Sequence, residues 1–82
     1  MNELLETIIE NYNDEELLIA DGFNEAVIGI DPNSNRIIYS ISKCIEILVK
    51  DMNDEDAREY FNYNVLGAYV GEKTPMFCDD EY

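Results

Sequence analysis

The 82-residue chain predicts a small single domain of the α+β class, with two to three helices packed on a short antiparallel β-hairpin or a three-stranded sheet. Hydrophobic residues make up 46% of the chain, and six Tyr and three Phe supply a core that a disordered acidic chain lacks. Short β-type runs lie between segments in which apolar residues recur at helical spacing. No linker or repeat divides the sequence. We therefore expect one domain over 1–82, made of an acidic helical segment (1–20), a core (21–78) and an acidic tail (79–82).

The first element predicted is an amphipathic helix that Asn2 caps. Its apolar positions follow a helical stripe, which comprises Leu4, Leu5, Ile8, Ile9 and Tyr12. Glu3, Glu6 and Glu10 then share the exposed side of this helix. Residues 14–20 fit either a short second helix or a strand, and the turn signal Asp21-Gly22 ends them.

A β-hairpin is predicted next. Ala26–Ile30 and Arg36–Ile41 are β-type runs, and the five residues between them, Asp31–Asn35, are all turn formers. Met76–Cys78 is a candidate third strand near the end of the chain.

Two further helices are predicted after the hairpin. Ser40 or Ser42 can cap the first, whose apolar stripe is Ile41, Cys44, Ile45, Leu48, Val49 and Met52. Asn53 begins the second, with three carboxylates in its first turn, and Gly71 is expected to end it in the left-handed conformation. From Tyr60 onward this helix is apolar nearly all round, so it is either central in the fold or part of an interface.

Two residues interrupt this last helix. Asn64 lies in its apolar stripe, and we expect its side-chain amide to hold the loop at 71–75 or a strand edge. Gly67 in mid-helix costs about 1 kcal/mol relative to Ala, so we expect another element or a second copy to pack closely there.

Charge is the strongest functional signal. The sequence has 19 Asp and Glu against 5 Lys and Arg, a formal net charge of -14, and its first basic residue is Arg36. Such a field repels nucleic acid, anionic membranes and nucleotides, and it attracts basic protein surfaces. We therefore expect a basic protein partner, and neither direct nucleic-acid binding nor membrane binding. The absence of an apolar run long enough to cross a membrane agrees with this expectation.

Catalytic chemistry is poorly supported. The chain has no His, which removes serine triads, Cys–His catalysis and imidazole metal ligation. Cys44 falls on an apolar stripe, and Cys44 and Cys78 form no metal or disulfide motif, which suits a reducing cytosol. Asp31–Asn35 begins like a Ca²⁺ loop, but Arg36 and Ser42 occupy the positions that require Gly and Glu, so a hairpin turn is favoured. We expect no enzyme activity, cofactor or metal.

Residues 59–77, EYFNYNVLGAYVGEKTPMF, resemble a signature in a widespread family of short, mostly uncharacterised proteins of tailed bacteriophages. Residues 21–30 and 39–48 are also similar to that family, and the acidic N-terminal helix lies outside the resemblance. The resemblance implies a phage origin and the bacterial host cytoplasm as the working environment. It implies no catalytic residues.

Two functional hypotheses follow. In the first, the chain is a non-enzymatic, phage-type inhibitor that imitates nucleic-acid phosphates and occupies the basic surface of a host defence or DNA- or RNA-binding protein. Its partner-binding acids would be Glu3, Glu6, Glu10, Asp14, Glu15 and Glu16. In the alternative, the chain is a small phage structural or assembly protein, or a homodimer. Its contact would then be an apolar surface of the last helix that comprises Tyr63, Leu66, Tyr69 and Val70.

Overall fold

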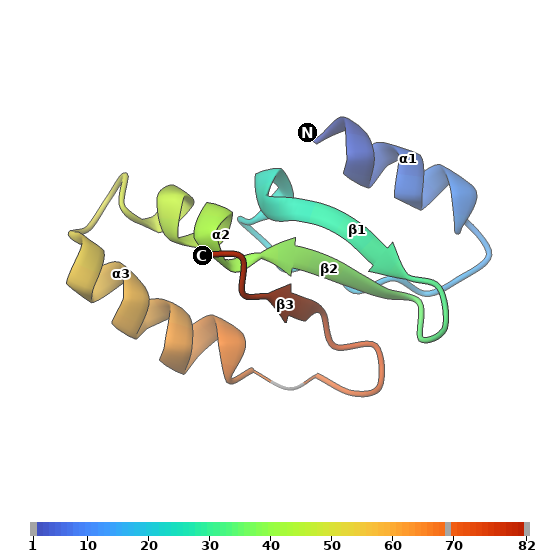
Figure 1. The fold of residues 1–82 in the computed structure, drawn as a ribbon. Helices are drawn as coiled ribbons and strands as arrows, with labels where there is room; N and C mark the ends of the chain where they lie inside the picture. The colour runs from blue at the N-terminus through green and yellow to red at the C-terminus, as the bar shows by residue number, and fades with distance from the viewer. Residues whose placement is uncertain (1, 69, 82) are drawn as a thin grey trace.

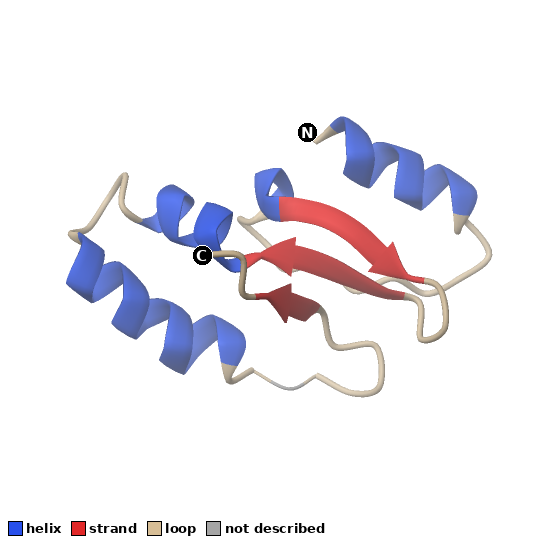
Figure 2. Cartoon of the chain, in the orientation of Figure 1, coloured by secondary structure: helices blue, strands red, loops and turns tan. Residues whose placement is uncertain are grey.

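The computed structural model describes residues 2–68 and 70–81, and it confirms an α+β domain with a three-stranded mixed sheet (Figures 1 and 2). Its elements, in order, are α1 (Glu3–Asn11), the 3₁₀ turn η1 (Asn24–Ala26), β1 (Val27–Asp31), β2 (Arg36–Ser40), α2 (Ile41–Leu48), α3 (Asp54–Tyr60), the π-helix η2 (Phe61–Leu66) and β3 (Met76–Cys78).

The sheet has the strand order β1-β2-β3. β1 and β2 form the predicted antiparallel hairpin, with a register shift between Val27 and Gly29. β3 is the predicted third strand, and it pairs parallel to β2 because the chain returns to the sheet only after α2, α3 and η2. The parallel register places Phe77 opposite Tyr39 and Met76 opposite Ile38.

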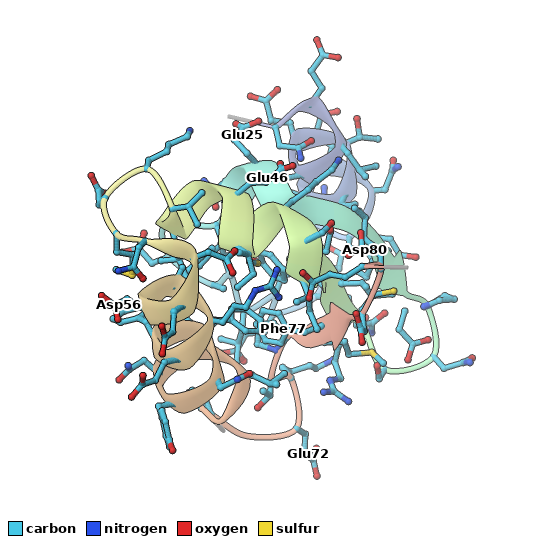
Figure 3. The ribbon with its side chains drawn as sticks, turned by 60° about the vertical axis from the view of Figure 1, so that its left-hand side comes forward. Glu25, Glu46, Asp56, Glu72, Phe77 and Asp80 are labelled. Atoms are coloured by element: carbon cyan, nitrogen blue, oxygen red, sulfur yellow. The ribbon has the colours of Figure 1, made fainter. Side chains whose placement is uncertain are left out.

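The two faces of the sheet have different surroundings. Tyr39 and Phe77 lie on the face toward the helices, where their rings stack at 5.5 Å and the ring of Phe61 meets Phe77 edge-on at 5.4 Å. Figure 3 shows Phe77 between α3 and the sheet. Ile38 and Met76, on the opposite face, are only partly buried and lie outside the core cluster. The core is therefore built on one face of the sheet.

α1 lies along β1, as Figure 1 shows. The Asn2 side chain accepts a hydrogen bond from the Leu4 N–H at 2.8 Å and donates one to the Val27 carbonyl at 3.2 Å, so the predicted cap also ties α1 to the sheet. Leu5 and Ile8 are buried. Leu4, expected in the apolar stripe, is 40% exposed because only one side of α1 contacts the fold.

Residues 14–20 form neither the helix nor the strand predicted for them. They run as an irregular segment across the core, where Leu17 and Ala20 pack against buried side chains. The Ala20 N–H donates to the Tyr39 hydroxyl at 2.7 Å. A tertiary contact therefore satisfies a backbone group that a regular helix or strand would otherwise have paired.

Ser40 caps α2, and its hydroxyl accepts from the Lys43 N–H at 3.2 Å. The acidic tail also reaches this helix start. Asp80 accepts hydrogen bonds from the Ser40 hydroxyl and the Ser42 N–H, and Glu81 pairs with Arg58 at 2.8 Å. The tail is thus attached to both α2 and α3.

This attachment predicts an acid-sensitive contribution to stability. The Ser40 hydroxyl, followed by the Ser42 N–H, lowers the pKa of Asp80 from 3.8 to about 2. Because the folded pKa lies below the unfolded one, the contribution is present above about pH 4 and is lost as pH falls through about 2. Urea unfolding should show Asp80→Asn less stable than the wild type at neutral pH, with the difference shrinking toward pH 2. A difference that is constant across this range would contradict the assignment.

The last helix departs from its prediction at the C-terminal end. Asn53 caps α3 as expected, accepting from the Asp56 N–H at 2.7 Å, but the helix widens into η2 and ends at Leu66. Gly71 does take a positive φ of 114°, yet it lies in the following loop and does not cap the helix. A Cβ on Gly67 would lie 3.3 Å from the Asn62 carbonyl oxygen. The close neighbour of Gly67 is therefore the backbone of its own wide turn, and the expectation that another element of the fold packs there was wrong. Packing of a second copy at Gly67 stays a prediction.

Candidate functional site

The acidic surface predicted on the N-terminal helix is formed by Glu3, Glu6 and Glu10 of α1, and all three residues are exposed. At a rise of about 1.5 Å per residue, their Cα atoms advance about 4.5 Å and then about 6 Å along the axis. Within residues 2–68 and 70–81, no Lys or Arg forms an ion pair with any of the three. The ordered helix therefore presents three unneutralised carboxylates in a row.

Asp14, Glu15 and Glu16 follow α1 and are also exposed, but they differ in their contacts. The Glu15 carboxylate lies 3.9 Å from the Lys73 ammonium, which brings residues 14–16 close to the loop before β3. Glu15 is therefore partly neutralised, and the other two acids extend the negative surface beyond the end of α1. Tyr12, predicted in the apolar stripe of α1, is partly buried against the core.

Three of the five cationic side chains are held by contacts within the fold. Arg58 pairs with Asp54 at 3.0 Å and with Glu81 at 2.8 Å. The Lys73 ammonium donates to the Ser34 carbonyl at 3.2 Å in addition to its contact with Glu15, and Arg36 donates to the Thr74 carbonyl. Among the described residues, these three cations are therefore engaged elsewhere, and none of them pairs with Glu3, Glu6 or Glu10.

The apolar alternative site is exposed in its described part. Tyr63 is 78% exposed, Val70 63% and Leu66 46%. Tyr69 lies outside the described residues. Phe61 is buried and Val65 packs against the core, whereas Tyr63 and Leu66 are exposed. The last helix therefore buries one side only and is not central in the fold.

Sequence reasoning missed an apolar groove of about 410 Å³ on the helix-covered side of the sheet. One wall is the irregular segment Leu18–Asp21, the other is η2 with Val70, and Phe77 and Pro75 contribute from the β3 region. The signal for this groove in the sequence was the apolar run Leu17–Ala20, which has no helical or strand period of its own. It did not reveal which distant residues would complete the groove.

Asn64 does not hold the 71–75 loop or a strand edge, as had been expected. It is exposed, and its side-chain amide donates to the Tyr60 carbonyl one turn earlier at 3.3 Å. The widened turn of η2 turns Asn64 toward the groove, which it helps to line. Asn64 therefore adds a polar residue to an otherwise apolar wall, with its amide bonded within η2.

The residues considered for metal or nucleophilic chemistry have structural roles. The Asp31 carboxylate accepts from the Ser34 hydroxyl at 2.7 Å and from the Asn33 N–H, and these hydrogen bonds lower its pKa as part of the hairpin turn. Cys44 is buried, which raises the pKa of its thiol to about 12 and makes it a poor nucleophile. Among the described residues, no three His, Cys, Asp or Glu side chains gather where they could hold a metal ion.

Comparison with protein-family models, curated proteins and solved structures finds no match to this chain. The resemblance to short phage proteins therefore stays a prediction. In the described part of the chain, none of the helices has both the length and the apolar character needed to cross a membrane.

Proposed function

We propose that this protein is a non-enzymatic inhibitor that binds a basic surface of another protein through the acidic side of α1. The observation that supports this most directly is the row of exposed, unpaired carboxylates of Glu3, Glu6 and Glu10 on an ordered helix. A net charge of -14 adds a long-range field that speeds encounter with a cationic partner.

The spacing of these carboxylates supports mimicry of nucleic acid. DNA phosphates recur about every 3.4 Å along the axis of one strand, the same scale as the advance from Glu3 to Glu6 and Glu10. A protein groove lined with Lys and Arg would therefore meet a similar series of negative charges. Together with the phage resemblance, this favours a host defence nuclease or another DNA- or RNA-binding protein as the partner, in the bacterial cytoplasm.

The proposal can be tested by capture from a bacterial lysate on the immobilised protein. We expect a nucleic-acid-binding protein to be retained at low salt and released by high salt, because exposed charges are screened within a Debye length of about 10 Å at 0.1 M. Excess double-stranded DNA should release the same protein. Retention that neither salt nor DNA reduces would contradict the proposal.

A second candidate function rests on the exposure of Tyr63, Leu66 and Val70. These side chains could join the chain to a larger assembly or to a second copy. The variant Leu66→Asp tests this candidate, because it places a charge in the surface at a position that is 46% exposed, where the fold should tolerate it. Light scattering with size exclusion should show a smaller species for Leu66→Asp than for the wild type. A wild type that is monomeric at high concentration would contradict self-assembly.

A further inference from the structure

The apolar groove between Leu18–Asp21 and η2 is preformed. The Tyr39 hydroxyl holds the backbone of Ala20 in the first wall. At the other wall, the Thr74 hydroxyl donates to the Gly71 carbonyl at 2.6 Å and accepts from the Val70 N–H at 2.9 Å. A ligand would therefore meet walls already fixed, which lowers the entropic cost of binding.

One carboxylate lines this apolar groove. Asp21 is the charged side chain among the described lining residues. The two cations near the loop before β3 are both engaged within the fold. Lys73 contacts Glu15 and the Ser34 carbonyl, and Arg36 donates to the carbonyl of the lining residue Thr74. The groove therefore combines an apolar interior with the charge of Asp21, in a chain whose net charge is -14.

This combination determines which occupant fits. A second copy of the chain would bring its own net charge of -14 against a chain of the same charge, so self-association in the groove is opposed electrostatically. A segment with one or two large apolar side chains flanked by Lys or Arg would bury the apolar groups and place its cations near Asp21, in the negative field of the chain. The volume of about 410 Å³ is within the range of about 300–1,000 Å³ that small-ligand sites occupy.

We infer that the groove binds a basic peptide segment of the partner protein, with a large apolar side chain as its anchor. The inference rests on the proposed function, because it takes the same cationic partner and specifies a second contact with it. The segment that follows α1 connects the two sites, since Asp14–Glu16 lead directly into the groove wall at Leu18. α1 would thus bind the folded basic surface of the partner protein, and the groove would bind an adjoining flexible segment of the same partner.

The test uses the full-length protein and three fluorescein-labelled hexapeptides in anisotropy titrations at about 150 mM salt. Lys-Lys-Leu-Phe-Lys-Lys carries both the charge and the anchors, Lys-Lys-Ser-Ser-Lys-Lys the charge alone, and Glu-Glu-Leu-Phe-Glu-Glu the anchors alone. Since burying a Leu or Phe side chain stabilises by about 1.5–3 kcal/mol, the first peptide should bind at least about tenfold more tightly than the second. The third should bind more weakly than the first. Equal affinities for the first two peptides, or for the first and third, would overturn the inference.

Two matched variants locate the binding. Ala68→Phe places a ring in the groove from an exposed position and should remove the tenfold preference. Asn62→Phe places the same ring at an exposed position of η2 outside the groove lining and should retain the preference. A preference that survives Ala68→Phe, in a protein whose circular dichroism matches the wild type, would overturn the inference. Charge reversal on α1 should leave the ratio of the affinities for the first and second peptides unchanged. The inference about the groove and the proposed function can therefore be contradicted separately.

Discussion

Replacing Glu3, Glu6 and Glu10 together by lysine is expected to abolish partner capture, with a loss of at least about 100-fold in affinity. Removing one partner of a close interfacial charge pair costs about 2–5 kcal/mol, and reversal adds repulsion at three sites. The fold should be retained, because all three side chains are exposed and Leu5 and Ile8, which anchor α1, are unchanged. Affinity can be measured by surface plasmon resonance with the captured protein.

A control variant separates local contact from net charge. Glu46→Lys, Asp51→Lys and Glu55→Lys together change the total charge equally, at exposed positions on or near α2 and α3. If α1 is the contact, this control should lower only the association rate, through the weaker overall field, and should keep most of the affinity. Similar losses in the two triple variants would mean that total charge, and no particular surface, attracts the partner.

Truncating Phe61 to alanine is expected to destabilise the domain by about 3–5 kcal/mol. Phe61 is 2% exposed, and its ring meets Phe77, which in turn stacks on Tyr39. This aromatic series joins η2 to the sheet, so its loss leaves a cavity between the two layers. For a domain of this size, each kcal/mol corresponds to about 4–8 °C in Tm, so thermal unfolding should show a large decrease or no folded baseline.

Tyr63→Ala is the matched control for this prediction. It removes another aromatic ring from the same helix, but at a position that is 78% exposed. Surface substitutions usually change stability by less than about 0.5 kcal/mol, so its Tm should stay close to that of the wild type. Equal decreases in Tm for the two variants would contradict the burial assigned to η2.

The sequence predicted those elements whose signals are local. The predicted helix caps Asn2, Ser40 and Asn53 are each confirmed. They could be predicted because a capping side chain accepts from a backbone N–H only two or three residues ahead and needs no distant partner. The hairpin was predictable for the same reason, because five consecutive turn formers lie between two β-type runs. The acidic side of α1 follows from helical spacing alone.

The features that sequence reasoning missed depend on residues far apart in the chain. Asp80 caps α2 across 38 residues, from a tail whose composition indicated only solvation. Residues 14–20 have no regular element because Tyr39 and the core hold them, and the widening at η2 moved the helix end from Gly71 back to Leu66. None of these contacts leaves a periodic pattern in the sequence.

The sequence by itself determined that this protein is an acidic α+β domain with a charged N-terminal helix, because charge and periodicity are properties of neighbouring residues. Only the tertiary structure decided which acids are neutralised, which apolar side chains stay exposed and where the groove lies. The physical reason is that burial and pairing belong to surfaces that meet after folding. Glu15 meets Lys73, and Leu18 and Val65 line the same groove, only when the chain packs on one face of its sheet.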